Sequence, residues 1–188
     1  MAVVKGNEIA TIDVVCVSIQ TYEENADEII LDTANHIDVQ ISTETQDAVK
    51  LIVKDRLVAQ KPESVVVTGN QITLTDNVFN DKVVPILQGG TCTYDQTTGA
   101  FKKYTPPVSG SNDKGKLFKL NAYSAIYDEA GILTGYEKIS YPNCQGTPFA
   151  FSSEDGTFRA SDYVINSAPA RGEAPFELEI VDSLPEVA

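Results

Sequence analysis

A single histidine limits the acid–base and nucleophilic chemistry that this chain could support. His36 lies within Ala34–Asp38, which predicts a turn between two short strands. A serine or cysteine nucleophile could still meet His36 in the folded chain. However, no nucleophile motif surrounds any serine, so we interpret His36 as a polar turn residue and expect neither a catalytic residue nor an enzyme.

Three cysteines, Cys16, Cys92 and Cys144, are the candidates for redox or zinc chemistry. No two of them have the spacing of metal ligands, and a zinc site would need all three scattered thiols together with His36. We interpret them as small buried apolar side chains in a reducing compartment. The sequence therefore predicts no metal and no cofactor.

Oxygen ligands are plentiful but do not form a recognisable site. The segment Asp76–Asp81 clusters side-chain oxygens as calcium loops do, yet it lacks the central glycine and the distal glutamate, and helix capping explains it better. A glycosidase-like pair could arise from carboxylates in or beside predicted strands, but the chain has no tryptophan to form a sugar platform. Those carboxylates are Asp13, Glu44, Asp47, Asp55 and Glu137.

The net charge of −13 argues against a conventional nucleic-acid binder, which needs a basic stripe to displace counterions from phosphate. Gly89–Gly90 belongs to no phosphate-binding loop, because neither GxxxxGK nor GxGxxG is present. The acidic surface serves either solubility or repulsion of nucleic acid, and composition alone leaves both open.

A chain of 188 residues with 42% hydrophobic residues is typical of one globular domain. No apolar run approaches the roughly 18 residues that span a bilayer. The N-terminal residues lack the pattern of a signal peptide. We expect a protein that is made and kept in the cytoplasm, unless it leaves by lysis or as part of a particle.

Period-two alternation and β-branched residues predict strands along most of the chain. Three strands, Ile9–Gln20, Glu28–Leu31 and Ile37–Ile41, are expected to form an N-terminal hairpin arm over about residues 9–41, with a corner at Asn35–His36. Asp47–Gln60 fits a strand better than a helix. Further strands are expected at Val65–Val67, Gln71–Thr75, Gly90–Asp95, Lys116–Tyr127, Tyr136–Tyr141, Thr147–Ser152, Tyr163–Ser167 and Phe176–Val181.

One turn and one long loop are expected between these strands. Thr68–Asn70 has the composition of a hairpin turn, and Gln96–Gly115 is predicted to be a long mobile loop. The one helix is expected between Val78 and Leu87, where apolar residues share a face and Gly89–Gly90 can end it. Since Pro85 is tolerated only in a first turn, the helix is expected to begin near Asn80 or Asp81, or to bend at Pro85.

These elements predict a mostly β fold, a sandwich or barrel of antiparallel strands with one flanking α-helix, in a single domain over residues 1–188. Three segments carry a resemblance to a known family: QITLTDNVFNDKVVPILQGG at 71–90, YPNCQG at 141–146, and SSEDGTFRASDYVINSAPARGEAPFELEIVDSLP at the C-terminus. With these segments the chain resembles bacteriophage major tail proteins, which are tail tube proteins, over about Gly69–Pro185. In the family, an acidic–Gly turn, an extended strand, a Gly-Xaa-Xaa-Pro stretch and a final strand often follow one another.

The resemblance implies a structural virion protein. Six subunits would join sheet edges into a ring, and rings would stack into a hollow tube that conducts DNA during ejection without binding it specifically. The implied partners are further copies of the chain and other tail proteins such as the tape measure and the tail terminator, with no membrane. Tyr22–Ala26 and Gln96–Gly115 are then candidates to order against the next ring, and the acidic charge fits a lumen that repels DNA.

Other functions stay open at this point. One alternative is another virion component, such as a head–tail completion or decoration protein. A second is a soluble β-sandwich binding module, for example one for carbohydrate, although the missing tryptophan argues against it.

Overall fold

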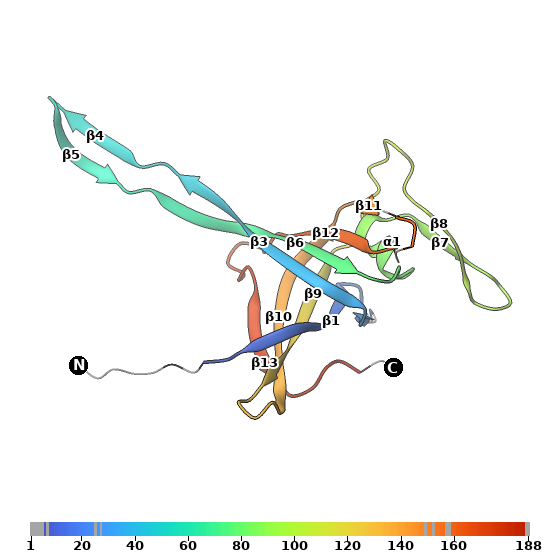
Figure 1. Cartoon of the computed structure of the whole chain (residues 1–188). Helices are drawn as coiled ribbons and strands as arrows, with labels where there is room; N and C mark the ends of the chain where they lie inside the picture. The colour runs from blue at the N-terminus through green and yellow to red at the C-terminus, as the bar shows by residue number, and fades with distance from the viewer. Residues whose placement is uncertain are drawn as a thin grey trace.

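The computed structural model describes residues 6, 8–24, 26, 28–148, 150–151, 153–156 and 159–186. These residues form thirteen strands and one short helix, arranged as Figure 1 shows. The elements are β1 (Thr11–Thr21), β2 (Glu28–Leu31), β3 (Ala34–Gln46), β4 (Val49–Val53), β5 (Arg56–Lys61), β6 (Ser64–Asp76), α1 (Val83–Gln88), β7 (Thr91–Tyr94), β8 (Phe101–Thr105), β9 (Phe118–Tyr127), β10 (Leu133–Gly146), β11 (Ala150–Phe151), β12 (Ser161–Ser167) and β13 (Glu177–Val181).

One large antiparallel sheet carries the body of the protein. Its strand order is β2-β1-β9-β10-β12-β6-β3, with β11 added to β12 and β13 added to β10. The long strand β10 joins two layers, because Tyr136–Ser140 pairs with β13 whereas Cys144–Gly146 pairs with β12. Between these stretches the register shifts and Asn143 adopts a φ of 47°, which marks a β-bulge that bends the strand.

The bend folds the sheet over a single core. One layer is β2-β1-β9-β10-β13 and the other is β12-β6-β3, and β1 and β3 approach each other on the far side. Alternate residues of each strand point into the core, as the pleat requires. The buried set comprises Val17, Ile19, Leu31, Ala34, Ile72, Leu74, Val83, Val84, Leu87, Phe118, Leu120, Ala122, Tyr141, Cys144, Tyr163 and Ile165. This architecture confirms the predicted fold class, a mostly β antiparallel sandwich with one short helix.

The helix α1 adds Val83, Val84 and Leu87 to this core. It begins at Val83, later than the predicted Asn80 or Asp81, and Pro85 lies in its first turn as the chemistry of proline requires. The residue before it, Lys82, makes no side-chain cap bond. At the other end Gly89 has a φ of 80° and its N–H donates to the Pro85 carbonyl at 3.0 Å, which confirms the predicted glycine stop.

The turn predicted at Thr68–Asn70 is wrong. Strand β6 runs without interruption through Gly69, which is buried against β12. A Cβ atom on Gly69 would lie 2.2 Å from the Ser167 carbonyl oxygen, so this glycine permits a close approach of two backbones within the sheet rather than a reversal of the chain.

Three further expectations are corrected. The stretch predicted as one strand, Asp47–Gln60, is a hairpin of β4 and β5 that turns at Lys54–Asp55. The expected corner at Asn35–His36 lies inside β3, where it is a register shift against β6. Within the expected long loop at 96–115, Phe101–Thr105 forms β8 and pairs with β7.

The segment expected as an N-terminal arm, residues 9–41, lies mainly in the body. Its strands β1 and β2 pair with each other, β1 also pairs with β9, and Val17, Ile19 and Leu31 are buried. A long projection from the body is instead formed by residues 43–67 (Figure 1). Some residues of the predicted segments lie outside the described residues. They are Asn25 in the loop Tyr22–Ala26, Phe149 and Ser152 in the strand Thr147–Ser152, and Thr157 and Phe158 in the C-terminal segment.

Candidate assembly surface

A long two-stranded hairpin leaves the body of the protein. We call residues 43–67 the projecting hairpin; they comprise the ends of β3 and β6 nearest the tip together with β4 and β5. Thr43–Gln46 pairs with Ser64–Val67, and Val49–Val53 pairs with Arg56–Lys61. At the tip Lys54 and Asp55 have φ values of 49° and 62°, which is the geometry of a two-residue type I′ turn. The turn therefore closes the hairpin without a loop.

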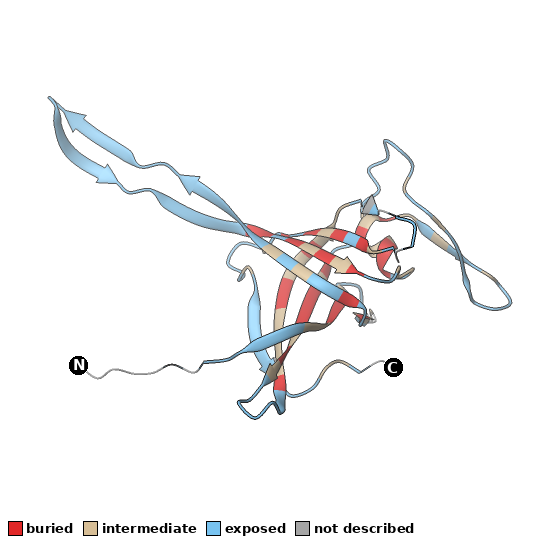
Figure 2. Ribbon diagram, in the orientation of Figure 1, coloured by how far each residue is buried: buried red, intermediate tan, exposed pale blue. Residues whose placement is uncertain are grey.

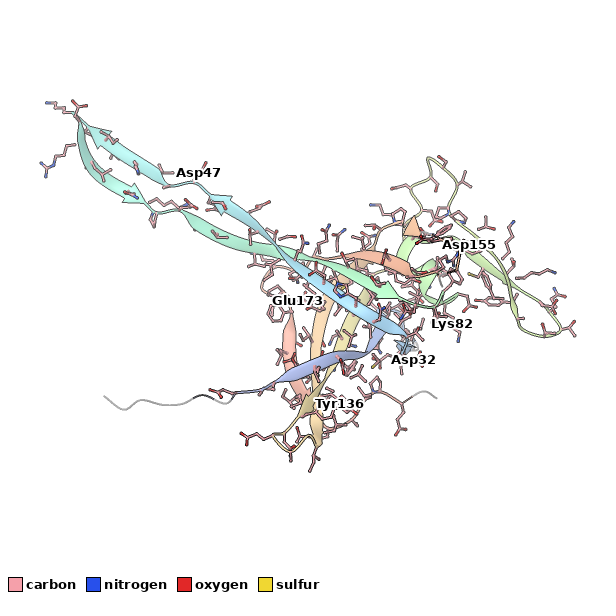
Figure 3. The ribbon with its side chains drawn as sticks, viewed as in Figure 1. Asp32, Asp47, Lys82, Tyr136, Asp155 and Glu173 are labelled. Atoms are coloured by element: carbon pink, nitrogen blue, oxygen red, sulfur yellow. The ribbon has the colours of Figure 1, made fainter. Side chains whose placement is uncertain are left out.

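Nothing in the described part of the chain covers this hairpin. Residues 40–68 are all exposed, and Figure 2 shows the hairpin exposed along its whole length. In Figure 3 its side chains, including the labelled Asp47, extend from the ribbon into solvent. The large apolar residues of the hairpin are therefore about half exposed, between 44% and 64%. They are Val49, Leu51, Ile52, Val53, Leu57, Val58, Val65, Val66 and Val67.

Both faces of the hairpin carry apolar side chains. Residues opposite each other in a ladder share a face, and faces alternate along a strand. Val49, Leu51 and Val53 consequently lie on one face, whereas Ile52 and its partner Leu57 lie on the other. A hairpin that only rested on its own body would need one apolar face, and apolar residues on both faces are typical of a strand pair that is buried on both sides.

The outer part of the hairpin, residues 49–61, differs in charge from the rest of the protein, whereas the projecting hairpin as a whole contains four basic and four acidic residues. Residues 49–61 contain four basic residues and one acidic residue out of the chain's 14 and 27, so the other residues carry ten basic and 26 acidic side chains. The charged residues of this stretch are Lys50, Lys54, Asp55, Arg56 and Lys61. Residues 49–61 are thus a cationic, apolar segment on a strongly acidic protein, and acidic surfaces attract this segment.

A second, shorter hairpin occupies part of the expected loop at 96–115. Asp95 shapes its turn, because its Oδ1 accepts from the N–H groups of Thr97 at 2.9 Å and Thr98 at 3.0 Å, and these bonds lower the pKa of the carboxyl group. Phe101 on β8 stacks against Phe79, with ring centroids 5.5 Å apart. The contact between Phe101 and Phe79 ties the hairpin to the segment that leads into α1.

Arg159 extends this aromatic contact. Its guanidinium lies 5.6 Å from the ring centroid of Phe79 and 4.9 Å from that of Phe151. Cation–π contacts of this kind hold surface segments together. The part of the chain expected to be a mobile loop therefore has at least one end anchored to the body.

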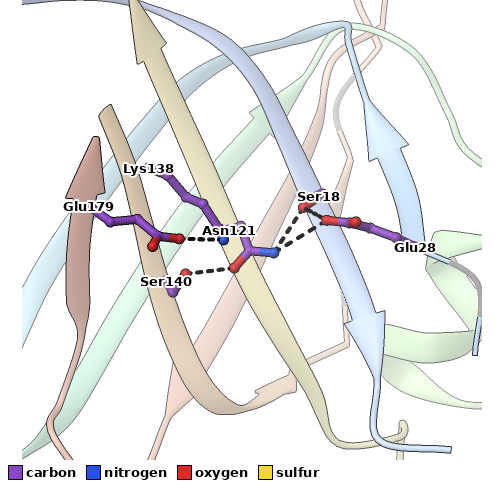
Figure 4. Close-up of polar contacts among 6 residues, drawn as sticks. All are labelled: Ser18, Glu28, Asn121, Lys138, Ser140 and Glu179. Carbon is purple, nitrogen blue, oxygen red and sulfur yellow. Dashed lines mark hydrogen bonds and ion pairs between the residues drawn. The ribbon is translucent and has the colours of Figure 1, made fainter. Parts of the chain in front are cut away.

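A polar row crosses the sheet on the face opposite the core (Figure 4). Asn121 of β9 donates from Nδ2 to Ser18 Oγ at 3.0 Å and to Glu28 Oε1 at 3.4 Å, and Ser140 Oγ donates to Asn121 Oδ1 at 2.7 Å. Ser18 Oγ also donates to Glu28. Ser18, Asn121 and Ser140 are buried and lie opposite each other in the ladder, so each bond fixes the register of neighbouring strands.

This row offers no activated nucleophile. No histidine belongs to it, and His36 lies on β3 opposite Thr75 with its side chain exposed. The lack of enzymatic activity stays a prediction. In the Asp76–Asp81 cluster, Asp76 accepts from the Val78 N–H at 3.2 Å and Asn80 accepts from the Lys82 N–H at 3.0 Å. Both side chains thus fix the backbone ahead of α1 and do not cap the helix itself.

The cysteines differ in their surroundings. Cys16 and Cys144 are buried as predicted, and burial raises the pKa of their thiols to about 11 and about 12. Cys92 is half-buried, and desolvation followed by the charge of Asp81 raises the pKa of its thiol. In the described ranges no three His, Cys, Asp or Glu side chains gather as a metal site, and none of the helices there is long and apolar enough to cross a membrane.

Comparison with known proteins gives likenesses to solved structures alone. No protein-family model and no curated protein matches the chain. A solved structure that matches is a chain of the "Cryo-EM structure of the anti-feeding prophage (AFP) baseplate, 6-fold symmetrised", with 7% sequence identity over 95% of this chain and 98% of that chain, at a TM-score of 0.37. A likeness at this level assigns no function to the chain.

Proposed function

We propose that this protein is a structural subunit that assembles with copies of itself, as the tail tube subunit of a bacteriophage or of a phage-derived particle. The observation that carries the proposal is the projecting hairpin, whose two apolar faces have no cover in the described chain. Exposed apolar patches of this kind mark sites of protein–protein contact.

The shape of the hairpin favours a polymer over a closed dimer. It extends away from the body (Figure 1), and in this proposal it contacts the body of the next copy rather than an equivalent hairpin. Such head-to-tail contacts close into a ring when the rotation divides a circle, and continue as an open assembly when it does not. Apolar residues on both faces give each hairpin two surfaces to cover, which suits a position between neighbouring copies.

The assignment to a tail tube rests on the sequence resemblance over Gly69–Pro185. In this proposal six copies form each ring, rings stack into a hollow tube in the virion, and the tape measure and tail terminator proteins are partners. Assembly takes place in the cytoplasm of the bacterial host. DNA passes through the lumen without specific binding, and the acidic charge of the body keeps it from adhering. Neutralising the carboxylates that face the lumen would then slow DNA passage.

Electron microscopy of the concentrated protein tests the proposal. The wild-type chain is expected to form hollow rods or rings with six-fold end views. The matched variant replaces residues 47–63 by Asn-Gly, because Gln46 and Ser64 are paired and a two-residue turn can join them. We expect this variant to keep its fold, since residues 47–63 are all exposed, and to stay dispersed.

Two results would count against the proposal. Rods formed by the shortened variant would show that the hairpin does not drive assembly. Single rings that never grow along their axis would instead favour a completion or decoration protein over a tube subunit.

A further inference from the structure

The last strand of the body has an unpaired edge and exposed apolar side chains. Strand β13 pairs with β10 alone among the described residues, so its other edge presents free backbone groups. Leu178 and Ile180 are 52% and 48% exposed although they lie on the core side of the sheet, beside Ile139 and Glu137. The core side of β13 is therefore an apolar surface that its own chain leaves open.

The other face of β13 is acidic. Glu177 and Glu179 alternate with Leu178 and Ile180 along the strand. Residues 173–182 contain four acidic residues and no basic one: Glu173, Glu177, Glu179 and Asp182. Glu179 already pairs with Lys138 of β10, whose Nζ lies 2.6 Å from its Oε1, whereas Glu177 stands opposite Ser140 and is exposed.

Strand β4 of the projecting hairpin has the complementary pattern. Val49, Leu51 and Val53 share one face, and Lys50 and Ile52 share the other, with Lys54 following at the turn. The outer edge of β4 is unpaired, because β4 and β5 form a sheet of two strands. The neighbouring strand β5 carries an extra residue, Val58, at a register shift, which makes its edge less regular.

We propose that β4 of one copy adds to the free edge of β13 of a second copy and continues that copy's sheet. This pairing places Val49, Leu51 and Val53 beside Leu178 and Ile180, and places Lys50 and Lys54 beside the acidic face of β13. It satisfies backbone groups on both edges and covers apolar surface on both copies. The opposite charges favour pairing between copies and fix which faces adjoin.

Other free edges in the described chain fit β4 less well. Strand β2 has four residues, of which Leu31 is buried, so it offers little apolar surface for a partner. The body portion of β3 approaches β1 of its own chain. Of these three edges, that of β13 combines exposed alternate apolar residues with an acidic opposite face.

A charge exchange tests this pairing, which rests on the proposed self-assembly. We expect Lys50→Glu combined with Lys54→Glu to raise the critical concentration for assembly by about tenfold, and Glu177→Lys to raise it to a similar extent. All three substitutions together are expected to return the critical concentration to within about threefold of the wild-type value. Glu129→Lys, the same charge change in the turn between β9 and β10, is the control and leaves it unchanged.

The outcomes separate the two proposals. If Glu177→Lys assembles like the wild-type chain while removal of the hairpin abolishes assembly, the hairpin drives assembly but does so against a surface other than β13. If the wild-type chain fails to assemble at all, the proposed function and this pairing both fall. A loss of assembly in the triple variant equal to the summed single losses would also overturn the pairing.

Cross-linking gives a second measurement that does not depend on charge. In a Cys92→Ser background, Leu51→Cys and Leu178→Cys in one chain are expected to give a ladder of covalent multimers with a short bismaleimide. Val108→Cys, at a position that is 81% exposed, replaces Leu178→Cys in the control. Equal ladders from both pairs would contradict a specific contact between β4 and β13.

Discussion

The two-faced hairpin leads to a quantitative prediction about Leu51 and Leu57, which lie on opposite faces of it. Each leucine is about half exposed in the isolated chain, at 53% and 52%. Complete burial of a leucine side chain contributes about 1.5–3 kcal/mol, so covering the exposed half contributes roughly 1 kcal/mol. Leu51→Ser or Leu57→Ser loses that contribution and adds about 1 kcal/mol for burying a hydroxyl group.

Each single variant is therefore expected to weaken assembly by about 2 kcal/mol per subunit, which raises the critical concentration on the order of 30-fold. The free energy of unfolding of the monomer is expected to change by less than about 0.5 kcal/mol, because neither side chain touches the core. Sedimentation across a concentration series measures the first quantity, and denaturant unfolding of the dilute protein measures the second.

A control and a refuting result complete this experiment. Ile132→Ser removes an apolar side chain that is 62% exposed in the turn between β9 and β10, and it should leave assembly unchanged. If either leucine variant assembles at the wild-type critical concentration, only one face of the hairpin is covered, and the inference from its two apolar faces is wrong.

Three further predictions concern the body of the protein. Gly69→Ala places a Cβ atom against the Ser167 carbonyl oxygen and should lower the free energy of unfolding, measured by denaturant titration, by about 1–3 kcal/mol. An unchanged denaturation midpoint would contradict the close approach of the β6 and β12 backbones at Gly69. A thiol reagent at pH 8 should label Cys92 in the native protein and all three cysteines only after unfolding, and rapid native labelling at a second site would show that the buried thiols are accessible. The ion pair of Lys138 with Glu179 lowers the pKa of the carboxyl group from 4.5 and raises the pKa of the amine from 10.5. The pair therefore stabilises the fold at pH values between 4.5 and 10.5, and its contribution is lost as pH falls through the lowered pKa or rises through the raised one. The difference in unfolding free energy between wild type and Lys138→Met should shrink in acid, and a difference independent of pH would exclude a role for the pair.

The sequence predicts the strands of the body well because one face of each is buried. Alternation in β1, β9 and β12 reports directly on the core, since Val17, Leu120 and Ile165 must point inward to be covered. The sequence also predicts the end of α1, because the backbone freedom of a glycine suits the φ of 80° that Gly89 adopts there. Local rules are reliable where local geometry decides the structure.

The failures occur where contacts between distant segments decide. Gly69 has the composition of a turn, but its actual role is set by Ser167, which lies almost a hundred positions later in the chain. The turn at Lys54–Asp55 has no glycine or asparagine to mark it, so the sequence predicts one strand where the structure has a hairpin. The apolar residues of that stretch were visible in the sequence, but the lack of cover for both faces appears only when the fold is known.

Hydrogen–deuterium exchange on dilute and concentrated protein tests most directly whether the projecting hairpin is covered by other copies. In dilute protein the backbone amides of β4 that do not pair with β5 are expected to exchange rapidly. The amides of Ile72 and Leu74 in β6 are expected to exchange slowly. On concentration, we expect amides across Val49–Lys61 to become protected while those of the core do not change. The proposal would be contradicted if the hairpin amides exchanged equally fast at every protein concentration measured.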